Sequence, residues 1–419
     1  MHVVFLIERK NYYRVLGPVI DRALACGWTT ECWHDYGQPR HGTKASEFPD
    51  ATPVFRHGTP RIRIHHSTTE LAALLAAERP DAVIALQRPA GLPIGDPTVW
   101  MGLQYTLDVA QLLDGAGRTA FDALGLHTEY WARCAPDALR LTNWTRARGT
   151  GRAPEPVDRA AVLATVTARG RIVGFPEMDQ AHSIDPGDVR RRLGLPTTQP
   201  VVLYLPFPFK SNPSTFWVRN IYGAGALRRR VAVALARRPH VKRGDSDRGV
   251  VDAVRAFCDV NGAALVVKAR AKDPVPGYLA RLADRVLYDE QYYPATILEL
   301  LKISTLCVHF FSTAAYEAAY AGVPSICVAP AGEDLGFPPI WREWFLSVEP
   351  GSSWNYPGVV YSRGLDHVLR QLPRERLSDY PLEPAARTQY VEKFVGFDDA
   401  KCADRVLDAV EGLVEERRR

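Results

Sequence analysis

The stretch from Leu306 to Ile326 reads LCVHFFSTAAYEAAYAGVPSI, and its pattern predicts a strand, a turn and a helix in direct succession. The apolar run 306–311 has the length of a buried strand, and Ser312 and Thr313 are residues that favour helix N-termini. The Gly-Val-Pro run that starts at Gly322 then ends the helix. A helix N-terminus that follows a parallel strand presents backbone N–H groups to phosphate oxygens. We therefore expect a phosphate-binding turn at Ser312 and Thr313.

Strands alternate with helices on both sides of this segment. This alternation predicts parallel sheets that are covered by helices on both faces, and hence an α/β fold with Rossmann-like, doubly wound domains. The expected strands are 2–8, 29–34, 81–87, 101–107, 172–175, 201–205, 264–268, 286–288, 306–311 and 325–329. The expected helices are 12–26, 68–79, 185–193, 250–260, 278–283, 295–303 and 313–321, followed by helical sequence from 384 to 419.

The alternation restarts at Val201, after a Gly-Leu-Pro stop at 194–196. We therefore expect an N-terminal domain of residues 1–196, a C-terminal domain of residues 197–383 and terminal helices over 384–419. No Gly-x-Gly-x-x-Gly run directly follows a strand, and no Walker A sequence is present, which argues against a dinucleotide dehydrogenase and a P-loop enzyme.

Composition narrows the class of protein further. The net charge of +5 is too small for a dedicated nucleic-acid binder, and it suits phosphate-bearing small ligands. The seven cysteines are scattered without zinc spacing, which favours a reducing compartment. The first apolar run is too short for a signal peptide, and no run reaches the roughly 18 residues of a membrane span. We expect a cytoplasmic protein without a nucleic-acid partner, and peripheral contact with the inner membrane face is compatible with this expectation.

The chain carries Ser312-Thr313, followed by Glu317 and by Gly322-Val323-Pro324. This run resembles the donor-site signature of GT-B glycosyltransferases. The run is also similar to that of CDP-glycerol glycerophosphotransferases and non-hydrolysing UDP-GlcNAc 2-epimerases. The resemblance implies that the helix N-terminus binds the diphosphate of a nucleotide donor and that Glu317 binds its ribose. The alternative is that Ser312 is a plain N-cap and Glu317 a solvated helix residue.

Two further runs resemble parts of the same architecture. Residues 173–179, VGFPEMD, resemble the Gly-x-Pro-x-x-Asp run that closes the N-terminal domain, and residues 397–406 resemble the final helices. The resemblance implies a GT-B fold, in which two Rossmann-like domains face a cleft and the C-terminal helix returns to the first domain.

His309 departs from one pattern of the resembled enzymes. Many retaining GT-B enzymes carry a second glutamate eight residues before the helix glutamate, and His309 occupies that position here. The departure favours inversion of the sugar. His309 is then either a catalytic residue or a histidine at the edge of the core.

Further donor contacts are expected at two other strand ends. Lys268 and Arg270 occupy alternate positions at a strand end, where both cations would face phosphates. Lys210 and Ser211 belong to the proline-rich loop 206–213 and could contact a diphosphate. The alternatives are an exposed basic strand end and a structural proline loop.

An inverting transferase needs a base that deprotonates the acceptor hydroxyl. Glu8 and Asp108 each follow a strand of the N-terminal domain and are the expected candidates; His65, His66 and His127 are less favoured. No carboxylate cluster has metal-site spacing, and the resemblance implies that cations and helix dipoles replace a metal at the leaving diphosphate. Apart from the nucleotide-sugar co-substrate, no cofactor is expected.

Together these observations favour transfer of a sugar from a nucleotide-sugar donor to a carbohydrate or lipid-linked acceptor, in cell-envelope or surface polysaccharide synthesis. A CDP-alcohol phosphotransferase with the same donor helix is the first alternative. A non-catalytic nucleotide-binding protein on the same fold is the second.

Overall fold

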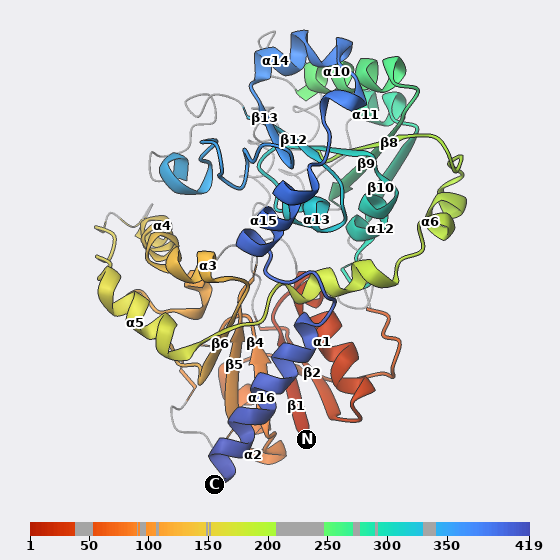
Figure 1. Ribbon diagram of the computed structural model, residues 1–419. Helices are drawn as coiled ribbons and strands as arrows, with labels where there is room; N and C mark the ends of the chain where they lie inside the picture. Colours follow the sequence, from red (N-terminus) through yellow and green to blue (C-terminus); the bar gives the residue numbers. More distant parts are fainter. Residues whose placement is uncertain are drawn as a thin grey trace, which may run out of the picture. The chain divides into compact units, whose positions relative to one another are not determined.

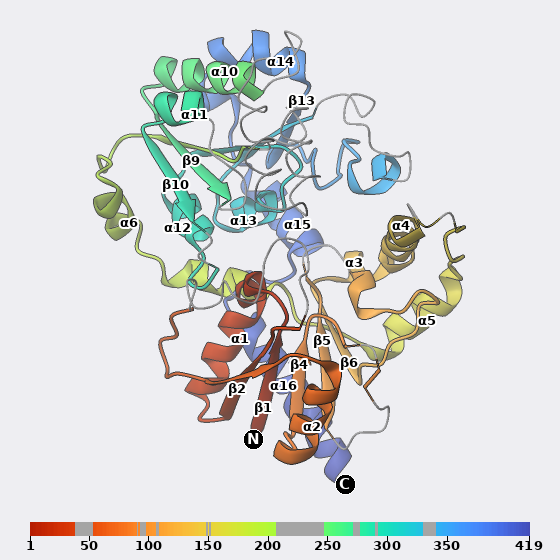
Figure 2. The ribbon, with the colours of Figure 1, turned by 180° about the vertical axis from the view of Figure 1, so that it is seen from behind.

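The computed structural model describes residues 1–37, 53–89, 91–92, 98–105, 109–147, 150, 152–206, 247–270, 277–289, 292–329 and 341–419. The chain forms two compact units. Unit 1 contains 1–183, 291–296 and 391–419, and unit 2 contains 184–290 and 297–390. In each unit, helices flank one sheet (Figures 1 and 2). This arrangement confirms the expected α/β class with two doubly wound units.

The sheet of unit 1 is parallel and has the strand order β3-β2-β1-β4-β5-β6-β7. The chain builds it outward from β1 in one direction through β2 and β3, and then continues on the other side of β1 with β4. The boundary between β1 and β4 is therefore the topological switch point. The strands are β1 (His2–Ile7), β2 (Thr29–Asp35), β3 (Arg61–His65), β4 (Ala82–Ala85), β5 (Val99–Leu103), β6 (Ala123–Leu126) and β7 (Gly170–Ile172).

The helices of unit 1 bury their apolar faces on this sheet. In α1, Val15, Leu16, Val19 and Ile20 have helical spacing, and all join the main core cluster of the unit. Ser67 caps α2, as expected, by accepting a hydrogen bond from the Glu70 N–H. The helices are α1 (Tyr13–Ala25), α2 (Thr68–Glu78), α3 (Glu129–Arg133), α4 (Ala135–Ala147) and α5 (Arg159–Arg169), with 3-10 turns η1 (Lys10–Tyr12), η3 (Val109–Leu112) and η4 (Pro176–Ser183).

The last helix, α16 (Cys402–Arg418), returns to unit 1, as the resemblance implies. It runs along α1 in both views (Figures 1 and 2), and Val406 and Val410 complete the core cluster beneath it. The expected Gly-x-Pro-x-x-Asp run makes the junction. Gly174 has a φ of 81°, and an added Cβ would lie 2.6 Å from the Cys402 Sγ. Only glycine allows this close approach.

The sheet of unit 2 is also parallel, with the order β10-β9-β8-β11-β12-β13. Its switch point lies between β8 and β11. The strands are β8 (Val201–Tyr204), β9 (Ala264–Arg270), β10 (Arg285–Asp289), β11 (Leu306–His309), β12 (Ser325–Val328) and β13 (Val360–Arg363). The helices are α6 (Pro186–Leu193), α10 (Asp247–Val260), α11 (Gly277–Leu282), α12 (Thr296–Ile303), α13 (Ala314–Tyr320), α14 (Leu365–Arg370) and α15 (Pro384–Phe394), with the short turns η5 (Trp341–Phe345), η6 (Leu372–Arg374) and η7 (Leu377–Asp379).

The units divide at Ser183, earlier than the expected boundary near residue 196. Helix α6 belongs to unit 2 because Val189 and Leu195 pack into a core cluster with Val201 of β8. Arg190 adds hydrogen bonds to the carbonyl oxygens of Gln199 and Ile303. Likewise, α15 belongs to unit 2 as far as Tyr390, so of the terminal helices only α16 lies wholly in unit 1.

No helix in the described part of the chain is both long enough and apolar enough to cross a membrane.

Candidate functional site

The turn between β11 and α13 lies at the switch point of unit 2. Strand β11 pairs with β8 on one side, and the Leu205 N–H donates to the Val308 carbonyl just beyond the β8 strand end. In open parallel sheets, ligands bind beyond the carboxyl ends of the strands at such a point. The expected phosphate-binding turn therefore occupies the position in unit 2 where the topology favours a ligand.

The turn is longer than the sequence predicts, because it spans residues 310–313 between β11 and α13. Strand β11 ends at His309, because Phe311 takes a φ of 42°, a left-handed conformation that costs a non-glycine residue energy. Ser312 and Thr313 follow with half-buried side chains, and the Ser312 Oγ accepts a hydrogen bond of 3.3 Å from the Ala314 N–H. Ser312 thus satisfies one backbone N–H at the start of α13, whose N-cap residue is Thr313. Its diphosphate contact stays a prediction.

His309 lies in the core beneath this turn. Its side chain is completely buried, and burial lowers its pKa to about 3, so the ring is neutral at pH 7. The Nδ1 atom accepts a hydrogen bond of 3.4 Å from the Ser312 N–H, so the proton is on Nε2, which lies 3.3 Å from the Ser325 Oγ. This geometry supports a role in positioning the turn.

Glu317 is buried within α13. Its residue exposure is 1%, and its carboxylate helps to raise the pKa of the Cys307 thiol, after the larger effect of burial. The alternative of a solvated helix residue is therefore wrong. A contact with ribose stays a prediction.

Lys268 lies at the same edge of the sheet. The register of β9, β8 and β11 places it level with His309, two strand spacings away, or about 10 Å. Its side chain is half-buried, and Nζ donates to the Ala269 carbonyl at 3.2 Å. Arg270 ends β9, but its side chain is outside the described part of the structure, as are residues Lys210, Ser211 and Asp108.

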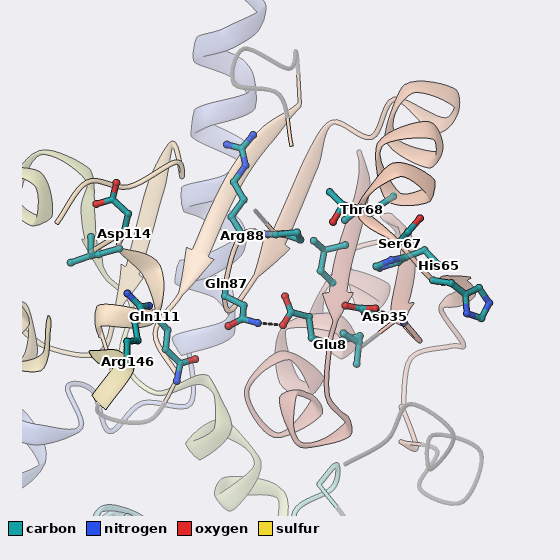
Figure 3. Close-up of a pocket in the computed structure, with 17 residues that line it drawn as sticks. Glu8, Asp35, His65, Ser67, Thr68, Gln87, Arg88, Gln111, Asp114 and Arg146 are labelled. Carbon is teal, nitrogen blue, oxygen red and sulfur yellow. Dashed lines mark hydrogen bonds between the residues drawn. The ribbon is translucent and has the colours of Figure 1, made fainter. Parts of the chain in front are cut away.

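A cavity of about 520 Å³ lies at the carboxyl ends of the first four strands of unit 1 (Figure 3). It therefore includes the switch point between β1 and β4, where the fold favours a ligand. Five of its lining residues are apolar. The titratable, amide and hydroxyl residues that line it are Glu8, Asp35, His65, His66, Ser67, Thr68, Gln87, Arg88, Gln111, Asp114 and Arg146.

Four of these side chains form a row across neighbouring strands, in the order Gln87, Glu8, Asp35 and His65. Asp35 and His65 are register partners in the β2–β3 pair, and Glu8 follows Ile7, which pairs with the residue before Asp35. The Gln87 amide donates a hydrogen bond to the Glu8 carboxylate (Figure 3). Neighbouring members are about 4.8 Å apart along the sheet, within the reach of one small ligand. We call these four residues the polar row.

Two other charged groups of the pocket, Arg88 and Asp114, already have protein partners. The Arg88 guanidinium lies 4.5 Å over the Trp100 ring, and Asp114 accepts hydrogen bonds from the Arg118 N–H and Nε. Of the less favoured histidines, His127 is buried and stacks on Phe175 with ring centres 3.4 Å apart. It is not among the residues that line this pocket.

Of the polar row, the sequence predicts Glu8 and, as a less favoured base, His65, but it does not reveal Asp35 and Gln87. Strand β3, which carries His65, is also missing from the expected strands. The signal was present, because Arg61-Ile62-Arg63-Ile64-His65 alternates polar and apolar residues with the period of a strand. Within the described residues, no group of three or more His, Cys, Asp or Glu side chains could hold a metal ion.

Solved structures identify this fold. The wall teichoic acid polymerase TagF aligns with a TM-score of 0.57 at 12% identity, covering 100% of this chain and 90% of that chain. A protein from Listeria monocytogenes that is described as a UDP-N-acetylglucosamine 2-epimerase aligns with a TM-score of 0.54 at 12% identity, over 99% of this chain and 96% of that chain.

The UDP-GlcNAc 2-epimerase from Neisseria meningitidis, bound to UDP-GlcNAc, aligns with a TM-score of 0.50 at 8% identity, over 98% of this chain and 100% of that chain. No family model matches the sequence, and no curated protein matches it. The chain therefore has the GT-B-type fold that these enzymes share, without a closer assignment to one subfamily.

Proposed function

We propose that this chain is a GT-B-type transferase, in which unit 2 binds a nucleotide-sugar donor and unit 1 binds the acceptor. The observation that carries the proposal is the placement of the β11–α13 turn at the β8–β11 switch point of unit 2. A sugar is transferred to a hydroxyl group of a carbohydrate or lipid-linked acceptor.

The donor site would be assembled from residues at the carboxyl edge of unit 2. Backbone N–H groups near Ser312 and Thr313 and the Lys268 ammonium would bind the diphosphate, together with Arg270, Lys210 and Ser211. Each charge-assisted hydrogen bond contributes about 1.5–3 kcal/mol, so a few are sufficient for micromolar binding. These cations would stabilise the leaving diphosphate, and no resident metal enters the proposal.

The acceptor would occupy the 520 Å³ pocket of unit 1. That volume lies within the usual range for small-molecule sites. Transfer with inversion is a single displacement. The acceptor oxygen bonds to the anomeric carbon, the bond to the diphosphate oxygen breaks, and a base takes the hydroxyl proton. Glu8 lies in this pocket, and Asp108 remains the other carboxylate expected from the sequence.

Two observations support inversion and a surface-polysaccharide role. The position at which many retaining enzymes carry a glutamate holds His309, which is buried and neutral. One of the similar structures belongs to an enzyme that builds a wall polymer. A lipid-linked acceptor would bring the protein to the inner membrane face as a peripheral partner.

CDP-alcohol phosphotransfer is a second candidate, and the likeness to TagF favours it. Several of the similar structures are of TagF, with TM-scores from 0.54 to 0.58, and two of them carry CDPG in their descriptions. In that reaction the acceptor oxygen attacks phosphorus, and CMP leaves in place of a nucleoside diphosphate.

A matched pair of serine variants tests the donor site. Ser312→Ala removes a hydroxyl group beyond the carboxyl end of β11. Ser304→Ala removes a hydroxyl group just before the amino end of the same strand. Nucleotides that raise the melting temperature of the wild type should stabilise Ser304→Ala equally and Ser312→Ala less. If no nucleotide shifts any of the three melting temperatures, the proposed donor site is wrong.

A further inference from the structure

His65 is the member of the polar row that its protein surroundings satisfy least. The residue is 4% exposed and lines the unit 1 pocket, yet its Nδ1 atom has no hydrogen-bond partner among the described residues. A buried polar atom without a hydrogen-bond partner is energetically unfavourable. A ligand group that donates a hydrogen bond to Nδ1 would remove this cost.

The backbone around His65 is firmly held. The His65 carbonyl accepts a hydrogen bond of 2.8 Å from the Tyr36 N–H. In the turn that follows, the Ser67 Oγ accepts from the Glu70 N–H at 3.1 Å, and the Glu70 carboxylate accepts from the His66 N–H at 2.6 Å. This reciprocal pair resembles a capping box, and it fixes the end of β3 to the start of α2. The imidazole therefore projects from a rigid support.

The surroundings of the ring favour one tautomer. The Ser67 backbone favours the protonated ring. Because Nδ1 has no hydrogen-bond partner among the described residues, we infer that the proton of the neutral ring is on Nε2. Nδ1 then keeps its lone pair and can accept a proton.

Burial keeps the ring neutral near pH 7. Burial lowers the pKa of His65 below its ordinary value of 6.5, while Asp35, Glu70 and the Ser67 contact oppose this shift and His66 adds to it. His34 is a further titratable neighbour on β2, and Glu8 lines the same pocket. A neutral imidazole beside a carboxylate is suited to act as a general base.

The rest of the polar row indicates which ligands fit. Glu8 and Asp35 are carboxylates that would repel a phosphate or another anion placed against them. Carboxylate and amide oxygens instead accept hydrogen bonds from neutral hydroxyl groups. The spacing of about 4.8 Å between strands suits hydroxyls on nearby carbons of one molecule. A polyol therefore matches the row.

We propose that His65, supported by Asp35, is the proton acceptor for a hydroxyl group of a polyol bound in the unit 1 pocket. The inference rests on the proposed function in taking this polyol as the acceptor of the transferred group. As the hydroxyl oxygen forms its new bond and the leaving phosphate oxygen takes the electrons of the old one, Nδ1 takes the proton. Glu8, held by Gln87, binds a neighbouring hydroxyl.

Nitrogen NMR of protein labelled in the histidine rings tests this directly, with glycerol as the probe polyol. The His65 signals are identified by their absence from His65→Asn and from His65→Gln, and His182→Asn is the control. We expect an unprotonated Nδ1 at pH 7, a pKa below 6.5, and a saturable shift on adding glycerol. Asp35→Asn should lower this pKa further, because the carboxylate favours the charged ring.

A proton on Nδ1 at pH 7, no response to glycerol, or a higher pKa in Asp35→Asn overturns the proposal. Donor turnover separates this inference from the proposed function. If His65 behaves as expected but the protein turns over no donor, only the proposed function is contradicted. In an active enzyme, His65→Asn should lower kcat by about 10²–10⁴-fold and leave the acceptor KM within a few-fold. Unchanged kcat contradicts the role of His65 alone.

Discussion

The Asp179 carboxylate accepts a hydrogen bond of 2.8 Å from the Ala403 N–H, which joins η4 to the first turn of the last helix. A second bond of 3.2 Å comes from the Cys402 N–H. An acidic side chain at this position satisfies two backbone donors at the N-terminus of α16. The returning helix of the GT-B-type fold is therefore attached to unit 1 by polar contacts as well as by its apolar face.

The burial of Asp179 makes the free energy of unfolding depend on pH. Burial raises the pKa of Asp179 from 3.8 to about 6, and the two backbone contacts only partly oppose the shift. Because the folded pKa is the higher one, the stabilisation is complete below pH 3.8 and is lost as pH rises through about 6. We expect Asp179→Asn to remove a change of about 1–3 kcal/mol in the free energy of unfolding between pH 4 and 7. Denaturant titrations of both proteins measure it, and identical pH dependence contradicts the assignment.

His309 should act on donor binding through the turn it supports. His309→Ala removes a buried ring and the acceptor of the Ser312 N–H, which should cost about 2–4 kcal/mol of stability and weaken nucleotide binding. His309→Asn keeps an acceptor oxygen near the position of Nδ1 and should recover part of the affinity. Calorimetric nucleotide titrations and melting curves measure both effects. A slower turnover in His309→Asn with normal affinity and stability would point to direct catalysis instead.

Lys268 should contribute one charge-assisted contact to the donor. Lys268→Ala is expected to weaken nucleotide binding about ten- to a hundredfold, equivalent to about 1.5–3 kcal/mol. Lys302→Ala, in the last turn of α12 before the amino end of β11, is the matched control and should bind normally. Equal affinity of both variants would place the phosphates elsewhere.

Glu8 should affect acceptor binding more than the chemical step. Glu8→Gln keeps the shape of the side chain but removes the charge that accepts hydrogen bonds from Gln87 and from an acceptor hydroxyl. We expect the acceptor KM to rise about tenfold, with a smaller change in kcat, while the exposed Glu411→Gln on α16 has no effect. If turnover instead falls by about a hundredfold or more while KM stays constant, Glu8 is the base.

The sequence predicted those parts of the fold that strong local patterns encode. Buried strands such as β11 and capped helices such as α2 have clear apolar runs or N-caps, so their positions were correct to within a few residues. Strand β3 was missed because its exposed Ile62 and Ile64 form no continuous apolar run at the edge of the sheet. The end of β11 was placed too late because a positive φ at Phe311 has no local signature.

The unit 1 site could be predicted only in part, for a related reason. Glu8 follows a strand that the sequence revealed, and a residue after a parallel strand must lie at the carboxyl edge. Asp35 and His65 become neighbours only through the register of β2 and β3, and register depends on contacts between distant segments. The burial of His309 and Glu317 likewise depends on packing that residue spacing does not specify.

Product analysis with a panel of nucleotide-activated donors tests the central claim most directly. The purified protein is incubated with UDP-, GDP- and CDP-activated donors and with glycerol or simple sugars as acceptors, and the products are identified by mass spectrometry. We predict release of a nucleoside diphosphate from one nucleotide-sugar, together with a glycosylated acceptor. Release of CMP from a CDP-alcohol would support phosphotransfer instead, and no turnover of any donor would contradict the claim that this chain is a transferase.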